Sequence, residues 1–159
     1  MQDEIVVGNF NLRLRPAMDA DIPFLRTLRI LTMHGCFKAV GVVPNDKDDM
    51  NRILNAFSHA RIVESEGVNI GLFKVVPEKT CIELYQIQLL PAYQNRGIAT
   101  VLLTQLIEQA NDSQRCIRLS VLHKNPAKNL YARLGFKVDV VSDHSYEMLY
   151  IPDIIPMTC

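Results

Sequence analysis

Apolar and polar residues alternate over residues 10–15, where Phe10, Leu12 and Leu14 are separated by polar side chains. Alternation with a period of two predicts a half-buried strand. Later runs rich in apolar and β-branched residues are bounded by turn residues, such as the Glu66-Gly67 pair, and predict further strands. These strands cover residues 60–65, 68–76, 81–90, 116–122, 136–141 and 146–151.

A second pattern, with apolar residues three or four positions apart, predicts amphipathic helices. The longest begins directly after Gly97, and a short one opens at Asn125, where a polar cap precedes a proline. Gly135 ends the short helix, because glycine adopts the backbone conformation that terminates helices. The predicted helices cover residues from about 21 to 33, 46–57, 98–110 and 125–135.

The order of these elements predicts the fold class. Strands joined by short turns pair antiparallel, whereas the strands at 81–90 and 116–122 are joined by a whole helix and must be parallel if they share a sheet. We therefore expect an α+β fold with a mixed, mostly antiparallel sheet of about seven strands and about four helices. One domain over residues 1–159, with its core at about 10–151, fits the length. The apolar connection at 33–45 is expected to form a lid or a part of the core.

Charge and cysteine content narrow the class of protein. The formal net charge of the 159 residues is zero, which excludes broad electrostatic attraction to nucleic acid or to an anionic membrane. The chain begins without a signal-peptide pattern, and no apolar run approaches the roughly 20 residues that span a bilayer, so we expect a cytoplasmic protein. Four widely spaced cysteines then predict free thiols, with neither a disulfide nor a metal site: Cys36, Cys81, Cys116 and Cys159.

The segment Gln94-Asn95-Arg96-Gly97-Ile98-Ala99 joins a predicted strand to the longest predicted helix. A helix start presents unpaired N–H groups and the positive end of the helix dipole, which together bind anions such as phosphate. Gly97 permits a tight turn and a close approach of the ligand, and Ala99 leaves space beside it. The segment matches neither a dinucleotide fingerprint nor a P-loop. A plain strand-to-helix turn remains the alternative.

Two motifs together extend this interpretation. Residues 94–99 match the signature Q/R-x-x-G-x-G/A, and residues 125–136 match N-x-A-x-x-L-Y-x-x-L-G-F. In this order, after a strand that ends Ile87-Gln88-Leu89-Leu90-Pro91, they resemble the GCN5-related N-acetyltransferase (GNAT) family. The resemblance covers residues 10–151 and implies the acyl-CoA N-acyltransferase fold. It also implies an enzyme that moves an acetyl group from acetyl-CoA to a primary amine of a small molecule or peptide, without a metal.

The resemblance also implies where the cofactor lies. In the family, the fourth strand carries a bulge and diverges from the fifth, which leaves a gap for pantetheine. Backbone groups of the strand end then bind pantetheine, and loop amides hold the pyrophosphate. In this chain the strand-end residues are Gln88, Leu89 and Leu90. The loop residues are Gln94, Asn95, Arg96, Gly97, Ile98, Ala99 and Thr100, and further cofactor contacts are expected from Asn125, Asn129 and Tyr131.

Three residues are candidates for the chemistry. Tyr131 matches the family tyrosine that protonates the departing thiolate, and its alternative role is that of a packed helix aromatic. Glu83 matches the position of the glutamate base in histone-type members, although a solvated strand carboxylate is equally consistent with the sequence. His123 is the rival base, because histidine titrates near neutral pH, and its alternative is an ordinary loop residue. Water is the third possibility for the base.

The sequence says least about the site that would bind the acceptor. In the family it is formed by the first two helices and the last hairpin, which carry no dominant charge here: Arg29, Thr32, Met33, His34, Phe37, Asp46, His144 and Tyr146. These residues suggest a small or mixed-polarity acceptor, although a solvated helix face predicts the same residues. A homodimer is a separate expectation about partners. Two competing hypotheses are a non-catalytic acyl-CoA-binding regulatory module and a protein-interaction domain without a ligand.

Overall fold

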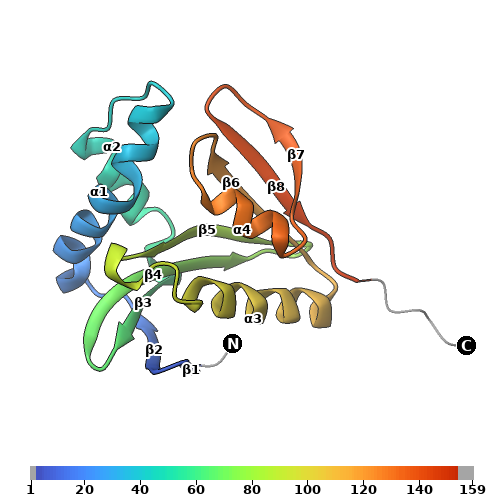
Figure 1. Cartoon of the computed structure of the whole chain (residues 1–159), viewed down its shortest axis with the longest axis horizontal. Helices are drawn as coiled ribbons and strands as arrows, with labels where there is room; N and C mark the ends of the chain where they lie inside the picture. The colour runs from blue at the N-terminus through green and yellow to red at the C-terminus, as the bar shows by residue number, and fades with distance from the viewer. Residues whose placement is uncertain (1–2, 154–159) are drawn as a thin grey trace, which may run out of the picture.

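The computed structural model describes residues 3–153, which form one eight-stranded sheet with the strand order β1-β2-β3-β4-β5-β6-β8-β7 (Figure 1). Neighbouring strands are antiparallel except β5 and β6, which run parallel. The parallel pair is the one that α3 connects, as the element order predicts. The strands are β1 (Glu4–Val7), β2 (Phe10–Pro16), β3 (Ala60–Ser65), β4 (Val68–Pro77), β5 (Cys81–Leu89), β6 (Cys116–Leu122), β7 (Lys137–Val141) and β8 (Ser145–Tyr150).

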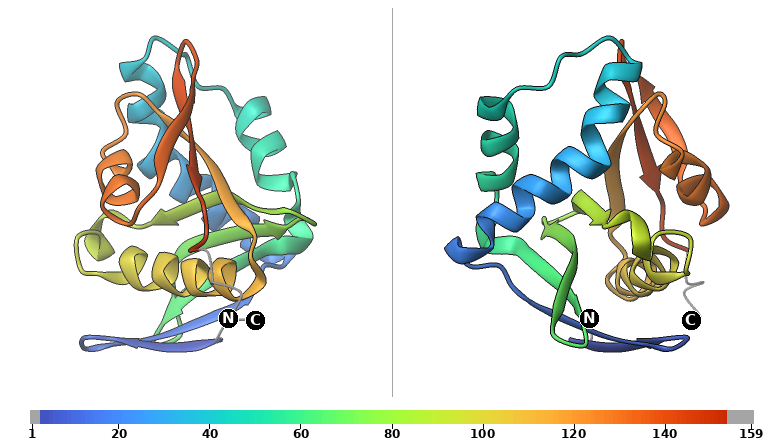
Figure 2. Two further views of the ribbon diagram at one scale, coloured as in Figure 1. Left: turned by 90° about the vertical axis from the view of Figure 1, so that its right-hand side faces the viewer. Right: turned by 60° about the vertical axis from the view of Figure 1, so that its left-hand side comes forward.

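Helices cover both faces of this sheet (Figure 1, Figure 2). The α-helices within residues 3–153 are α1 (Ile22–Ala39), α2 (Asp46–Leu54), α3 (Ile98–Ser113) and α4 (Ala127–Arg133). α1 and α2 pack on one face and α3 and α4 on the other, so that two separate hydrophobic clusters form. In the described part of the chain, no helix combines the length and the apolar character that crossing a membrane requires.

The larger hydrophobic cluster lies between the sheet and α3. It includes Leu102, Leu103 and Leu106, which are fully buried at helical spacing. The smaller cluster joins α1 and α2 to β3 and β4 and contains Leu28 and Ile53. The apolar stripes that predict these helices are therefore the faces that the sheet buries.

The predicted α+β class is confirmed, but the sequence analysis missed β1 and therefore counts one strand too few. β1 is only four residues long and pairs with β2 through a tight turn at Gly8. Ile5 and Val7 point into the larger cluster, whereas Glu4 and Val6 are exposed. Two buried residues are too few to give a clear alternation pattern in the sequence. A strand this short is stabilised by its pairing and packing with neighbouring elements.

The first helix is longer than predicted. Residues 33–39 continue α1, and only residues 40–45 form a loop, so the prediction of a connection over 33–45 is wrong for its first half. Gly35 inside the helix disfavours it by about 1 kcal/mol relative to alanine, and this explains the mistaken boundary. Packing offsets that cost, since the Phe37 ring lies 5.4 Å from the guanidinium carbon of Arg29. α2 ends earlier than predicted, at Leu54.

The expectation that the cysteines are free thiols is wrong for two of them. Cys81 and Cys116 form a disulfide between β5 and β6. The two residues are register partners in this parallel pair, with their Cα atoms 4.5 Å apart, a separation within the range of disulfides. Sequence spacing cannot show such a pairing because 35 positions separate the residues along the chain. Cys36 is a free thiol, and Cys159 lies outside the described residues.

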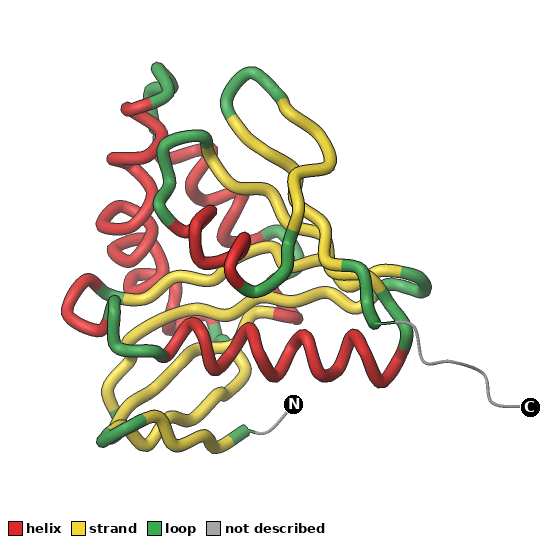
Figure 3. Tube along the Cα trace, turned by 45° about the vertical axis from the view of Figure 1, so that its right-hand side comes forward, coloured by secondary structure: helices red, strands yellow, loops and turns green. Residues whose placement is uncertain are grey.

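Two irregularities of β5 open the sheet, as the family resemblance implies. The register of β4 and β5 shifts between Val75, opposite Leu84, and Lys74, opposite Gln86, which places a bulge at Tyr85. β5 pairs with β6 only as far as Leu84. Beyond this point the two strands diverge, and β6, β7 and β8 rise away from the end of β5 (Figure 3). The predicted bulge and gap are both present.

Candidate active site

A cleft of about 770 Å³ lies where β5 and β6 diverge. Its walls come from the end of β5, the loop to α3, the first turns of α3, α4 and the outer half of α1. The cleft therefore joins the two motifs of the sequence, although the 25 residues from 100 to 124 lie between them. Of the predicted cofactor residues, it is lined by Gln88, Leu89, Gln94, Asn95, Gly97, Ile98, Ala99, Thr100, Asn125, Asn129 and Tyr131.

The loop before α3 has the backbone geometry of an anion site. Asn95 and Gly97 have φ values of 60° and 85°, in the left-handed region that glycine adopts most readily. The first backbone hydrogen bond of α3 runs from the Val101 N–H to the Gly97 carbonyl. The amides of residues 98–100 precede this bond and so lack a partner within the helix, while their residues line the cleft. They can therefore bind a phosphate at the positive end of the helix dipole.

The side chain of Gln94 connects the loop to β5. Its Nε2 donates a 2.9 Å hydrogen bond to the carbonyl of Leu89, the last residue of β5. The backbone N–H of Gln94 donates to the Pro91 carbonyl, so this predicted amide already has a partner. The motif glutamine thus fixes the shape of the loop, while the amides of residues 98–100 lack a partner within the helix.

Two predicted cofactor residues do not line the cleft. The Leu90 N–H donates to the Ile70 carbonyl of β4 at 2.8 Å, so this amide is already satisfied inside the sheet. Arg96 is exposed, and its guanidinium carbon lies 5.8 Å from the centre of the Phe10 ring, outside the cleft wall. The cofactor contacts predicted for these two residues have no counterpart in the lining of the cleft.

α4 brings Tyr131 to the wall opposite the loop. Its start is capped by Asn125, whose Oδ1 accepts a 3.0 Å hydrogen bond from the Ala127 N–H, as its position before Pro126 predicts. Tyr131 is buried, and its ring centre lies 5.7 Å from that of Phe136. Burial raises the pKa of the Tyr131 phenol to about 12, so the hydroxyl stays protonated at neutral pH and can donate a hydrogen bond.

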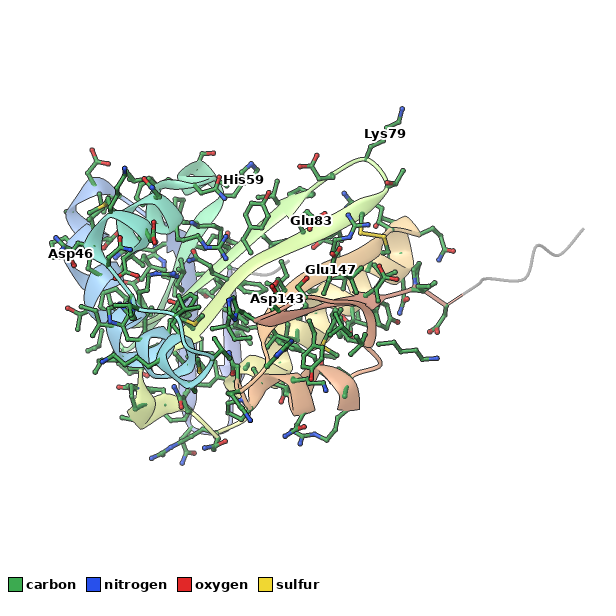
Figure 4. All side chains as sticks on the ribbon, turned by 90° about the horizontal axis from the view of Figure 1, so that it is seen from above. Asp46, His59, Lys79, Glu83, Asp143 and Glu147 are labelled. Atoms are coloured by element: carbon green, nitrogen blue, oxygen red, sulfur yellow. A yellow bond between two sulfur atoms is a disulfide. The ribbon has the colours of Figure 1, made fainter. Side chains whose placement is uncertain are left out.

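Glu83 lies on β5 away from the cleft lining. Its Oε1 is 3.1 Å from a terminal nitrogen of Arg118, its register partner on β6. The Arg118 Nε is in turn 2.9 Å from Oε1 of Glu147 on β8, so one guanidinium lies between two carboxylates. Figure 4 shows Glu83 on β5 and Glu147 on β8, the strands on either side of β6, seen from above. Glu83 is therefore held in an ion pair away from the cleft lining.

His123 also lies outside the cleft lining. One ring nitrogen is 3.1 Å from the Ser145 carbonyl, and the ring packs on Tyr146 with a centroid distance of 4.4 Å. Its backbone N–H donates to the carbonyl of His144. These contacts connect the end of β6 to the β7–β8 hairpin. The structure thus brings Tyr131 and the cofactor loop together but leaves both candidate bases outside their cleft.

The sequence analysis missed several residues of the cleft. Arg133, the last residue of α4, supplies a cation to the lining, and no sequence signal identifies it. Tyr93 lines the cleft from the short turn between β5 and the loop. α1 contributes two acceptor-side predictions and two further residues: Thr32, Met33, Leu31 and Cys36. Burial raises the pKa of the Cys36 thiol, which stays neutral.

Comparisons with known proteins support a single family. The model of the acetyltransferase (GNAT) family matches residues 33–136, which is more than half of the chain and includes both motifs. A comparison with curated protein sequences finds no match. Within residues 3–153, no three His, Cys, Asp or Glu side chains are grouped so that they could hold a metal ion.

Solved structures share the fold at low sequence identity. The PaiA N-acetyltransferase of Thermoplasma acidophilum, in complex with coenzyme A, has a TM-score of 0.68 and 16% identity, over 88% of this chain and 98% of that chain. The ribosomal-protein-S18-alanine N-acetyltransferase of Escherichia coli has a TM-score of 0.66 and 16% identity, over 93% and 98%. Arabidopsis thaliana Naa50, in complex with the bisubstrate analogue CoA-Ac-MVNAL, has a TM-score of 0.62 and 17% identity, over 87% and 97%. Together with the family match and the cleft, these likenesses lead to one conclusion: the chain belongs to the acetyltransferase (GNAT) family and is an acyltransferase that takes its acetyl group from acetyl-CoA.

Proposed function

We propose that the protein transfers the acetyl group of acetyl-CoA to a primary amine of a small molecule or peptide by direct attack of the amine on the thioester. One observation carries this proposal. The divergence of β5 and β6 creates a single cleft that has the anion-binding loop on one wall and the Tyr131 side chain on the other. The phosphate site would hold the acetyl donor, and the proton donor would assist the departing thiolate.

The loop fits the pyrophosphate of coenzyme A. The amides of residues 98–100 and the dipole of the sixteen-residue helix α3 supply the positive potential. The left-handed Gly97 and the small Ala99 let the diphosphate approach the backbone. Arg133 adds a cation to the lining from the opposite wall. Gln88 and Leu89 border the gap between the strands, where the pantetheine arm would extend beside β5.

Tyr131 is suited to assist the leaving group. The amine nitrogen attacks the thioester carbonyl, the carbon–sulfur bond breaks, and the sulfur leaves as a thiolate. The protonated phenol of Tyr131 donates a hydrogen bond to the developing negative charge on sulfur and stabilises it. Because its pKa is about 12, the phenol holds its own proton tightly and acts first as a hydrogen-bond donor. The proton lost by the amine finally appears on the coenzyme A thiol or in solvent.

Three candidates are proposed for the base that takes the proton from the amine. Glu83 and His123 remain predictions, and water is the third. Neither side chain lines the cleft, so each would act through a bound water or after the acceptor extends onto β5 and β6. An acceptor whose amine has a pKa of about 8 loses its proton more readily than lysine, with a pKa of about 10.4, and needs less help.

The structural relatives support an amine acceptor of the peptide type. One is named for its action on the alanine of ribosomal protein S18, and another was solved with the bisubstrate analogue CoA-Ac-MVNAL. In this chain, the acceptor would enter between α1 and the β6–β8 face, past Leu31 and Met33 on the cleft wall. These side chains are apolar, which favours an acceptor with an apolar group beside its amine.

An acceptor panel tests the proposal. Small amines, amino acids, polyamines and short peptides are each incubated with acetyl-CoA while the release of free thiol is followed. We expect turnover with at least one amine, and the Tyr131→Phe variant should lower kcat by about 100-fold without changing the affinity for coenzyme A. Binding of coenzyme A without turnover of any amine would favour the non-catalytic regulatory module. An unchanged kcat in Tyr131→Phe would remove the tyrosine from the mechanism.

A further inference from the structure

The hairpin formed by β1 and β2 lies beneath α3 (Figure 2). Side chains at its tip contact the cofactor loop. Val7 and Phe10, which flank the turn at Gly8, are register partners at that tip. Neither strand belongs to either motif, and residues 33–136 of the family match leave the whole hairpin outside. Its contacts with the loop are therefore an independent observation about the cofactor site.

Two aromatic rings connect the hairpin to the loop. The ring centres of Phe10 and Tyr93 are 5.7 Å apart and the planes are tilted by 57°, a geometry that aromatic pairs favour. Tyr93 is half-buried and also lines the cleft. Tyr93 thus belongs to the cofactor site, and Phe10 belongs to the hairpin.

The same phenylalanine also holds the arginine of the loop. The Arg96 guanidinium carbon lies 5.8 Å from the centre of the Phe10 ring, within the range of a cation–π contact. Arg96 sits between Asn95 and Gly97, the two loop residues with left-handed backbone. Fixing its side chain on the ring therefore restrains the part of the loop whose conformation is least favourable when it is free.

Val7, also at the tip of the hairpin, lies beside the loop as well. Its Cγ1 lies 3.8 Å from the point where a Cβ on Gly97 would stand, so the hairpin lies next to the glycine that precedes α3. Val7 also belongs to the same buried cluster as Ile98, the first residue of the helix. The hairpin tip thus contacts Tyr93 and Arg96 and lies next to Gly97.

We propose that the β1–β2 hairpin is part of the cofactor site, with Phe10 as a positioning residue that holds Tyr93 and Arg96 and so preorganises the pyrophosphate loop. This inference rests on the proposed function, since it assigns a role within the same cleft. A loop that already has its bound conformation loses less entropy when the ligand arrives. The effect of Phe10 must therefore appear in the affinity for the phosphate part of the donor, and not in the chemical step.

Phe10→Ala is the first test, with the dissociation constant for coenzyme A measured by calorimetry and kinetics measured with acetyl-CoA. We expect the dissociation constant to rise about fivefold, as loss of an exposed cation–π contact and of some loop order implies, with kcat at saturation within twofold of wild type. Phe10→Trp, which keeps an aromatic face, should restore the affinity. Phe57→Ala removes a partly buried phenylalanine that packs on the other cluster, and it should leave the affinity unchanged.

A donor without phosphates separates positioning from general stability. Acetyl-pantetheine lacks the pyrophosphate, so Phe10→Ala should not change kcat/KM for this donor. A double-mutant cycle with Arg96→Ala should show that the second substitution adds little once the first is made, because both remove the same contact. If Phe10→Ala does not fold, Phe10→Leu keeps the apolar volume and removes the ring face, and the same rise in dissociation constant is expected.

Two outcomes would overturn the inference: an unchanged dissociation constant in Phe10→Ala or Phe10→Leu, or an equal loss of kcat/KM with acetyl-pantetheine and with acetyl-CoA. Failure of the proposed function looks different. In that case wild type itself either binds no coenzyme A or acetylates no amine. A wild type that binds coenzyme A and a Phe10→Ala variant that binds it equally well would remove only the role of the hairpin.

Discussion

The two ends of the cleft are built in different ways. The cofactor end is made largely of backbone: left-handed residues at 95 and 97, amides at the start of α3, and one side chain, Gln94, that bonds to a main-chain carbonyl. All of these groups lie within a few positions of one another in the sequence. A short motif therefore specifies this end almost completely.

The α1–α2 side, from which the acceptor is proposed to enter, depends instead on pairs of side chains from distant positions. Asp49 of α2 accepts a 2.7 Å hydrogen bond from Arg29 and lies 2.7 Å from a ring nitrogen of His34, both on α1. Burial alone would raise the pKa of Asp49, but these two partners lower it below its usual value. Removing one member of a buried ion pair typically costs 3–5 kcal/mol, so this network fixes how α2 sits against α1.

A buried lysine anchors the other end of α2. Lys74 of β4 is almost fully buried, and its Nζ donates hydrogen bonds of 2.7–3.1 Å to the carbonyls of Arg52, Ile53 and Asn55. It thereby satisfies the end of the helix with a positive charge at the negative end of the helix dipole. Burial lowers the pKa of Lys74 to about 8. The position of α2 is thus fixed by contacts that no local motif encodes.

This difference explains why the sequence identifies the acetyl donor but not the acceptor. Backbone geometry at the cofactor end follows from glycine and helix-start signals over six residues. The pairing of Arg29 with Asp49 spans 20 positions, and that of Lys74 with Arg52 spans 22. Such pairs become visible only when the fold brings them together.

Gly97→Ala is the substitution expected to disturb the cofactor end most. A φ of 85° is unfavourable for alanine by about 1–2 kcal/mol, and the added Cβ meets nothing closer than Val7 at 3.8 Å, so the cost is one of backbone conformation. The loop should shift toward ordinary backbone angles. We expect the KM for acetyl-CoA to rise about tenfold, since 1.4 kcal/mol corresponds to a factor of ten.

Gly41→Ala provides the matched control for this prediction. Gly41 has a similar φ of 82°, its Cβ position is open, and it lies in the loop between α1 and α2. Both variants should lose a similar amount of free energy of unfolding in denaturant titrations. Only Gly97→Ala should change the KM, and equal KM changes in both variants would show that strain alone, and not the position of the loop, sets the affinity.

Smaller effects are expected from Glu83→Gln and His123→Ala at the edge of the acceptor end. A general base that acts directly contributes about 100-fold or more. Because both side chains lie off the cleft wall, we expect each variant to lower kcat/KM by less than about fivefold and to keep the acidic limb of its pH profile. That limb then belongs to the amine of the acceptor. Tyr131, with a pKa of about 12, should add no alkaline limb below pH 10.

Loss of the acidic limb in one of these variants, and not in the other, would contradict that expectation. It would identify the altered residue as the base and show that the acceptor end reaches over the rim of the cleft. Arg118→Met serves as a control for Glu83, because it removes the guanidinium that holds the carboxylate without removing the carboxylate itself.

Much of the fold follows from the periodicity of apolar residues, but its irregular parts do not. The bounds of β3 and β6 agree with the alternation in the sequence. The start of the sheet at β1 and the outer half of α1 were missed, because a four-residue strand and a helix that contains Gly35 are stabilised by packing and not by local preference. The disulfide between Cys81 and Cys116 depends on strand register, which composition cannot supply.

The residues of the site also differ in whether the sequence predicts them. Tyr131 and the loop from Gln94 to Thr100 were predicted because each lies in a motif, and the cleft brings them together. Phe10 carries no such signal: its contacts with Tyr93 and Arg96 join positions more than 80 apart in the sequence. The walls contributed by α1 were predicted only in part for the same reason. Local motifs identify the cofactor, and the tertiary structure defines what surrounds it.

A crystal structure of the protein with bound coenzyme A tests the central claim most directly. The account predicts the pyrophosphate on the amides of residues 98–100 and the sulfur within about 3.5 Å of the Tyr131 hydroxyl, a contact distance suited to a hydrogen bond to sulfur. Coenzyme A that lies outside the gap between β5 and β6, or a sulfur turned away from Tyr131 with the pyrophosphate off the loop, would contradict it.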